Sequence, residues 1–184
     1  MKTILKIFAP ALCVLLVLAS PAAAEKGSGK DSGLSKKAQE QYDLAFEKAL
    51  VHYEKANLLY ENEKLKEAAG EIEAIIDLEF PEGSEKMDGP QLQLDMYAFL
   101  AEIYLDLGRP KDAVILLVDG IKKSPDISKK TYQLYMTLGH ALKTQGEVDA
   151  ALEAFEKAQM INEELLKQEE KGKKEETSGE SEEE

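Results

Sequence analysis

The side chains that could support catalysis or bind a metal are few and widely spaced in this sequence. The two histidines, His52 and His140, lie far apart, and neither belongs to the zinc-binding motif His-Glu-x-x-His. Glu82, Glu85 and Asp88 are close together but lack the spacing of a calcium-binding loop. No acid, base and nucleophile converge. The sequence therefore predicts a protein that is not an enzyme and that has no catalytic residue, no metal site and no cofactor.

The charge of the chain restricts the kinds of partner that it can bind. The 184 residues include 23 Lys and Arg against 36 Asp and Glu, which gives a formal net charge of −13. Binding to nucleic acid requires a surplus of basic side chains on some face, so this composition argues against that class of partner. Hydrophobic residues make up 43% of the chain, which is enough for one domain with a core.

Residues 1–24 have the pattern of a secretory signal peptide. Lys2 and Lys6 flank the start of an apolar run that ends at Leu18, and three alanines ending at Ala24 suit a cleavage site. The run is too short for a spanning helix, which needs about 20 residues. Cleavage would also remove Cys13, the only cysteine. We expect export to a bacterial periplasm and no stable membrane span after cleavage, with a retained signal acting as an anchor as the alternative.

The composition divides the remaining chain into three parts. Residues 25–37 form a Gly- and Ser-rich flexible linker, and residues 167–184 form an acidic tail that is expected to be disordered. Residues 38–166 carry apolar side chains at three- and four-residue steps, which is typical of helices. Proline and glycine clusters divide this folded domain into six predicted helices, at residues 37–61, 64–79, 90–107, 110–123, 128–145 and 147–168.

One spacing recurs in the three successive helix pairs. A small residue in each first helix is followed twelve positions later by an alanine in the second helix. Small side chains allow two antiparallel helices to approach closely, so the sequence predicts the same helix crossing three times. The three pairs of small residues are Ala56 with Ala68, Ala101 with Ala113, and Gly139 with Ala151.

This pattern resembles the tetratricopeptide repeat, a helix-turn-helix unit of about 34 residues. The unit at about 132–165 matches best, through Tyr135, Leu138, Gly139, Leu142, Gly146, Val148, Ala151, Phe155 and Ala158. The unit at about 94–127 matches through Tyr97, Leu100, Tyr104, Gly108, Ala113 and Pro125. The resemblance implies an all-α fold, an α-solenoid of three such pairs with an extended first helix and a long last helix.

The first unit, at about 49–82, departs most from the family pattern and is interpreted as degenerate. Glu63 stands where the family has its turn glycine, and His52 stands where the family has an aromatic residue. An insertion around Gly83 to Gly89 separates this unit from the next. The sequence allows two arrangements of the extended first helix: it caps the N-terminal end of the stack, or it docks elsewhere.

In such a repeat the first helices line a concave side, where the resemblance implies that peptides or partner helices bind. The predicted groove combines tyrosines at one end, three carboxylates in the middle and a basic end, and the same stripe includes Ala98. Its residues are Tyr53, Asn57, Tyr60, Asp95, Glu102, Leu105, Asp106, Met136, His140 and Lys143. Such a groove favours a protein or peptide segment with Lys or Arg beside an apolar anchor. The alternative is that the carboxylates are merely a solvated face.

The sequence thus predicts an exported scaffold or adaptor that binds partner proteins, in the assembly or maintenance of a cell-envelope complex. The alternative is a periplasmic small-ligand binding protein that uses the same concave surface. Members of the family often end with an extra capping helix, whereas here the last predicted helix carries unaccounted apolar residues. A homodimer through this helix is a further hypothesis, based on Met160, Ile161, Leu165 and Leu166.

Overall fold

The computed structural model describes residues 33–179, and of residues 172–179 it describes the backbone alone. The predicted signal peptide at 1–24, most of the predicted linker and the last residues of the predicted tail lie outside the described residues. The described part contains six helices and no strand, so the prediction of an all-α fold is confirmed.

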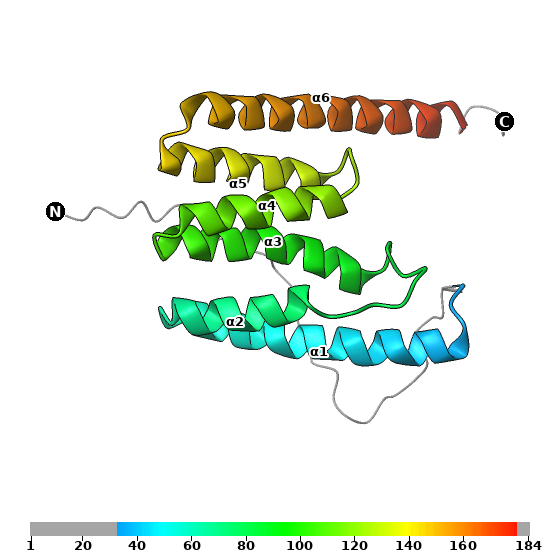
Figure 1. Cartoon of the computed structure of the whole chain (residues 1–184). Helices are drawn as coiled ribbons and strands as arrows, with labels where there is room; N and C mark the ends of the chain where they lie inside the picture. Colours follow the sequence, from blue (N-terminus) through cyan, green and yellow to red (C-terminus); the bar gives the residue numbers. More distant parts are fainter. Residues whose placement is uncertain (1–32, 180–184) are drawn as a thin grey trace. The chain divides into compact units, whose positions relative to one another are not determined.

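The helices follow one another in chain order, as Figure 1 shows. Each predicted helix is present, and the pairs are joined by short turns except for the insertion between the second and third helices. The six helices are α1 (Lys36–Glu61), α2 (Leu65–Ile76), α3 (Asp88–Asp106), α4 (Pro110–Lys123), α5 (Lys129–Gln145) and α6 (Val148–Gly179).

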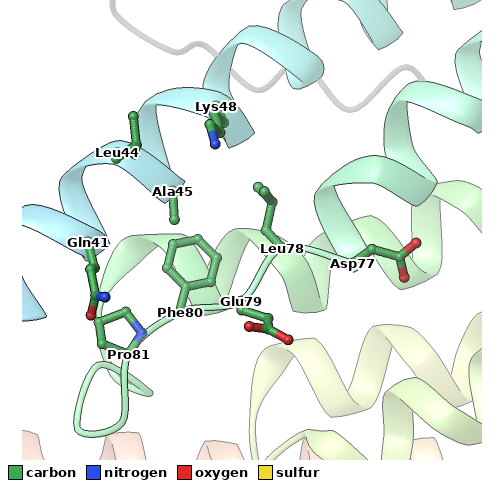
Figure 2. Close-up of a pocket in the computed structure, with 9 residues that line it drawn as sticks. All are labelled: Gln41, Leu44, Ala45, Lys48, Asp77, Leu78, Glu79, Phe80 and Pro81. Carbon is green, nitrogen blue, oxygen red and sulfur yellow. The ribbon is translucent and has the colours of Figure 1, made fainter.

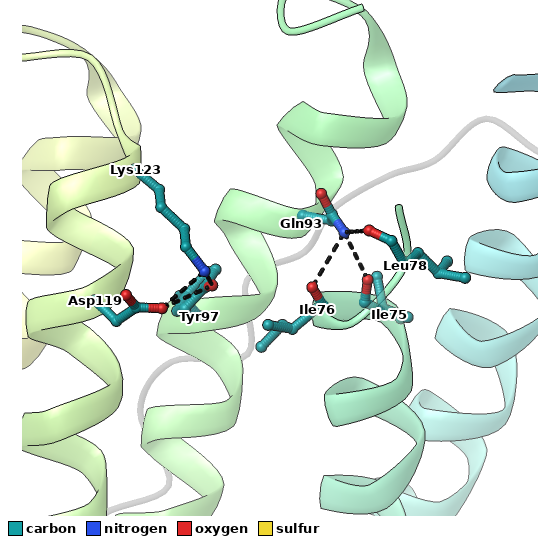
Figure 3. A network of polar contacts seen from close by, with 7 residues as sticks. All are labelled: Ile75, Ile76, Leu78, Gln93, Tyr97, Asp119 and Lys123. Atoms are coloured by element: carbon teal, nitrogen blue, oxygen red, sulfur yellow. Dashed lines mark hydrogen bonds and ion pairs between the residues drawn. The ribbon is translucent and has the colours of Figure 1, made fainter. Parts of the chain in front are cut away.

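The two helices whose ends differ most from the prediction are α2 and α6. The helix α2 ends at Ile76 instead of residue 79, because the chain turns away there and the Gln93 side chain binds the exposed carbonyl groups (Figure 3). Its amide donates to the carbonyl oxygens of Ile75 at 2.9 Å and Leu78 at 2.7 Å. The helix α6 continues past residue 168 to Gly179, because Glu, Lys and Gln are strong helix formers.

The contacts between helices describe an open stack in which the first helices face inward. Each helix packs against the next one in the chain, and α1, α3 and α5 also contact one another in turn. Within the described residues, α2 does not contact α4, and α4 does not contact α6. The second helices are therefore spread apart while the first helices lie close together, which places α1, α3 and α5 on the inner side of the curve.

The small residues at the three predicted helix crossings are buried. Ala56, Ala68, Ala101 and Ala113 have no exposed surface, Ala151 is 4% exposed and Gly139 is buried. Close approach of the paired helices is what removes these side chains from water. The same crossing is thus repeated through the stack, as the spacing predicted.

The turns within the three pairs share one backbone conformation. Glu63, Gly108 and Gly146 all have positive φ, at 59°, 70° and 83°. In each turn the next amide donates to the carbonyl five residues earlier, as Lys64 does to Leu59 at 2.9 Å. This left-handed conformation at the end of a helix favours glycine, and Glu63 adopts it although it carries a Cβ atom.

The inserted loop between α2 and α3 packs against the extended part of α1. The rings of Phe80 and Tyr42 lie 5.5 Å apart, and Tyr42 also stacks on Phe46 at 5.7 Å. The backbone N–H of Gly89 donates to the Tyr42 hydroxyl at 3.0 Å. The loop therefore covers Tyr42 in the N-terminal half of α1, while Leu44 stays 56% exposed.

Candidate functional site: the inner face of the helix stack

Three of the predicted groove residues meet where the C-terminal ends of α1 and α3 lie together. Tyr60, on α1, packs its ring edge-on against Phe99 of α3, with the ring centroids 5.3 Å apart. The Tyr60 hydroxyl lies near the carboxylates of Asp106 and Glu102, whose negative charges raise its pKa. We call Tyr60, Glu102 and Asp106 the inner cluster.

The pKa values of two groups in the inner cluster are raised above their ordinary values. Burial raises the pKa of the Tyr60 hydroxyl, and the negative charges of Asp106 and Glu102 raise it further. The pKa of the Glu102 carboxyl is also raised, first by desolvation and then by the charge of Asp106. The Glu102 side chain is nevertheless open to solvent.

The two carboxylates of the inner cluster have no basic partner within the described part of the chain. The ion pairs found there involve neither Glu102 nor Asp106. The two residues are four positions apart on one helix, so their charges repel one another. The inner cluster can therefore accept a cation from outside the chain.

Three other predicted positions on α3 already contact the chain itself. Asp95 forms an ion pair with Lys130 of α5, so its charge is compensated. Ala98 was predicted to belong to the same exposed stripe, but this is wrong: it is 1% exposed, and α5 packs against α3. Leu105 is half-buried and packs against the core. Of the α3 stripe, Glu102 and Asp106 offer the free polar groups.

The remaining predicted groove residues are not joined to the inner cluster. On α1, Tyr53 is half-buried against the core and Asn57 is half-buried. On α5, Met136 is half-buried, His140 and Lys143 are exposed, and the His140 ring lies edge-on against Phe155 of α6 at 5.2 Å. None of the hydrogen bonds, ion pairs or ring contacts of the described residues connects these five side chains with Tyr60, Glu102 or Asp106.

Three cavities lie away from the inner face, and none of them is lined by a predicted groove residue. One, of about 480 Å³, opens between α1 and the inserted loop (Figure 2). Leu44 and Lys48 line its α1 side, and Leu78, Glu79 and Phe80 line its loop side. The sequence did not predict it, because it depends on how the insertion folds back onto α1.

The other two cavities lie on the outer side, next to α4. One, of about 350 Å³, lies between α2 and α4, over Tyr97 and Tyr104 of α3. The other, of about 670 Å³, is lined largely by α4. The cavity between α2 and α4 exists because these two helices do not contact each other.

A polar network ties α3 to its neighbours on this outer side. The Tyr97 hydroxyl donates to Asp119 at 3.1 Å, and Lys123 contacts both groups (Figure 3). The Tyr104 hydroxyl donates to Glu73 of α2 at 2.6 Å, and burial together with this carboxylate raises the pKa of Tyr104 to about 12. The hydrogen bond of Lys123 lowers the pKa of the Asp119 carboxyl. These groups satisfy one another and connect α2, α3 and α4.

The histidines do not form a reactive group. The Nδ1 atom of His52 lies 2.6 Å from a carboxylate oxygen of Glu71, which joins α1 to α2. His140 packs on Phe155 in the last pair. Within residues 33–179 no three His, Cys, Asp or Glu side chains are grouped as metal ligands would be. The same residues include no helix with both the length and the apolar character needed to cross a bilayer.

An open stack of antiparallel helix pairs with one solvent-accessible inner face defines a helical-repeat protein. A family model described as Tetratricopeptide repeat matches residues 132–165, which cover α5 and the first half of α6. No curated protein matches the sequence. Residues 132–165 are thus similar to a tetratricopeptide repeat, and the described helices form an all-α stack of helix pairs. Repeats of this family generally mediate protein–protein interaction.

Proposed function

We propose that this chain is an exported tetratricopeptide-like scaffold that holds a partner protein through the inner face of its helix stack, within a complex of the cell envelope. The observation that carries the proposal is the inner cluster, where two carboxylates without a basic partner lie beside an aromatic pair. The position of the cluster on the first helices supports this, because the inner side of a helical repeat is a continuous surface for an extended partner.

The chemistry of the inner cluster favours a basic side chain next to an apolar one. A Lys or Arg of the partner would lie between Glu102 and Asp106 and remove their mutual repulsion. The neighbouring rings of Tyr60 and Phe99 offer an apolar surface for the adjacent side chain. The partner is therefore a protein segment that carries a basic residue beside an apolar anchor.

The proposed contact surface also includes residues of α1 and α5 that no observed contact joins to this cluster. Asn57 lies one turn before Tyr60 on α1 and would hydrogen-bond the backbone of the partner, and Tyr53 would add apolar contact. Met136, His140 and Lys143 would meet the far end of a longer segment. Because the three cavities lie off this face, we favour a protein partner over a small ligand for it.

Export is proposed from the N-terminal sequence. Residues 1–24 have the charged start, short apolar run and small-residue end of a secretory signal. Expression in a bacterium with fractionation of the periplasm tests this part separately. The expected result is a periplasmic protein whose mass corresponds to a chain that begins after Ala24, and an unprocessed cytoplasmic protein would contradict it.

Charge reversal on the inner face tests the binding site. We expect the double variant Glu102→Lys and Asp106→Lys to abolish salt-sensitive capture of the partner from envelope extract. The matched control is Glu153→Lys with Glu156→Lys, because these are two exposed acidic residues of α6 without an ion pair in the described part of the chain. Equal capture by the reversed and the control proteins would overturn the proposed site.

A further inference from the structure

The outward side of α4 carries apolar side chains at two positions where the other helix pairs have none. Ile115 is 70% exposed, and Val118 is 39% exposed. Counted from the small residues at the helix crossings, their counterparts are Gly70 and Glu73 in α2, and Glu153 and Glu156 in α6. The repeated packing of the stack therefore does not require an apolar residue at either position.

Ile115 and Val118 line the cavity of about 670 Å³ that extends along α4. Its lining begins at Arg109, directly before the helix, and ends at Lys122 in the last turn. This part of a helix rises about 20 Å, so the cavity is long enough for an extended segment of about six residues. We call Arg109, Ile115, Val118 and Lys122 the outer site.

Arg109 is held at the start of this cavity by two contacts. Its guanidinium carbon lies 4.3 Å from the centroid of the Tyr104 ring, and its Nε atom donates to the Asp112 carboxylate at 2.6 Å. The nearby Glu73 carboxylate accepts the Tyr104 hydroxyl and forms no ion pair with Arg109 in the described part of the chain. No hydrogen bond of the two Nη atoms is found among residues 33–179. The guanidinium group is therefore oriented while its Nη donors stay available.

The acidic residues that line the cavity are already paired within the chain. Asp112 is paired with Arg109, and Asp119 is paired with Lys123 at 2.8 Å (Figure 3). Lys122 lies near Asp119 but forms no ion pair in the described part of the chain. The outer site thus keeps an uncompensated positive charge, although the chain as a whole carries −13. A carboxylate from outside the chain is the group that complements it.

We propose that the outer site binds an acidic segment of a second partner protein. A carboxylate of this segment accepts hydrogen bonds from the Nη atoms of Arg109, and an adjacent apolar side chain packs on Ile115 and Val118. An arginine that is already oriented loses little conformational freedom when it binds a carboxylate through two parallel hydrogen bonds. Lys122 attracts a further carboxylate at the other end of the segment.

The outer site and the inner cluster favour partners of opposite charge. The inner cluster has two carboxylates on a first helix, whereas the outer site has an oriented guanidinium group beside a second helix. The inference therefore does not rest on the inner cluster. A chain with both sites would join two different proteins, one through a basic segment and the other through an acidic segment.

Binding of the purified protein to an array of short synthetic peptides tests the proposal. Each peptide carries one Leu or Phe between Asp or Glu residues at a different separation, and a matched peptide has Asn or Gln in place of every acid. We expect the best acidic peptide to bind about tenfold more tightly than its amide counterpart, and salt to weaken this binding. No binding of any acidic peptide, or equal binding of the amide peptides, would overturn the proposal.

Variants of the outer site locate the binding on the protein. Arg109→Gln and Ile115→Ser should each weaken binding of the best peptide about tenfold, since each removes one of the two contacts. The matched controls are Lys66→Gln and Leu152→Ser, which change an exposed basic and an exposed apolar residue of other helices and should bind normally. Because Ile115 is 70% exposed, Ile115→Ser should leave the circular dichroism unchanged. Normal binding by both outer-site variants would overturn the proposal.

A photo-cross-linker in place of Ile115 identifies the occupant in cells that express the chain. We expect cross-links to another protein, at a segment in which mass spectrometry finds Asp or Glu beside a large apolar side chain. Cross-links to a second copy of this chain, or to no protein, would contradict the proposal. The double variant Glu102→Lys and Asp106→Lys should leave binding of the acidic peptide unchanged, so that a failure of the inner cluster is distinguished from a failure of the outer site.

Discussion

Gly139 of α5 lies directly against the ring of Phe155 of α6. A Cβ atom placed on Gly139 would come within 2.4 Å of the nearest ring carbon, which is far closer than a normal contact. In the preceding pair the corresponding residues are Ala101 and Leu117, and both are fully buried. Equivalent helix crossings in the stack are therefore packed by two different residue pairs: a glycine with an aromatic ring, and an alanine with a leucine.

Replacing the Gly139–Phe155 pair by an alanine–leucine pair gives the first prediction. Gly139→Ala should lower the free energy of unfolding by about 1–2 kcal/mol, because the Phe155 ring must move. Adding Phe155→Leu should recover most of this loss, since it recreates the pair found at Ala101. Gly70→Ala is the control: its Cβ would meet nothing within 4 Å, so higher helix propensity should stabilise by up to about 1 kcal/mol. Urea unfolding measures all three, and an unaffected Gly139→Ala variant would contradict this account of the crossing.

The turn after α1 gives the second prediction. Glu63 has a φ of 59°, a conformation that glycine adopts without steric cost. Glu63→Gly should therefore stabilise the protein by about 1 kcal/mol. The reciprocal change, Gly146→Ala, should destabilise it by a similar amount, because Gly146 has a φ of 83°. Thermal unfolding compares the two, and a destabilised Glu63→Gly variant would show that the glutamate side chain stabilises the turn.

The helices and their crossings could be predicted from the sequence because both are local. Apolar residues at helical spacing, the punctuation by Gly108, Pro110 and Gly146, and the paired small residues are all visible without knowledge of neighbouring units. The end of α2 could not be predicted. It depends on Gln93, which reaches from α3 to the last carbonyl groups of α2.

The loop between α2 and α3 gives the third prediction. Tyr42→Phe should destabilise the protein by about 1–3 kcal/mol, because the buried N–H of Gly89 loses its acceptor. The control is Tyr53→Phe, since no hydrogen bond of the Tyr53 hydroxyl is found among the described residues. Hydrogen exchange should show faster exchange at Gly89 in the Tyr42→Phe variant alone. Equal stability of the two variants would mean that this hydrogen bond does not hold the loop.

The raised pKa of Glu102 gives the fourth prediction. Folding raises this pKa above its ordinary value of 4.5, so the folded state favours the neutral carboxyl group. The resulting stability is fully present below the ordinary pKa and is lost as pH rises through the raised pKa. Glu102→Gln should therefore raise the melting temperature near neutral pH, and the gain should disappear below pH 4.5. The control Glu54→Gln changes an exposed α1 residue outside the observed ion pairs and should show no such gain. A gain that persists at acidic pH would contradict a charge effect.

The inner cluster was predictable in part, and the limit has a physical reason. Glu102 and Asp106 are four residues apart on one helix, so helical spacing alone places them on one face. The pairing of Asp95 with Lys130 and the burial of Ala98 depend on how α5 lies over α3. The rotation between successive units decides such contacts, and it is not encoded within a single helix.

A photo-cross-linker at the inner cluster measures the central claim most directly. In one variant the cross-linker replaces Asp106. In the matched control it replaces Glu153 on α6. Cells that express either variant are then irradiated. We predict a discrete adduct with another protein at position 106, lost when Glu102→Lys is added, and no such adduct at position 153. Equal labelling at the two positions, or none at 106, would contradict a partner-binding inner face.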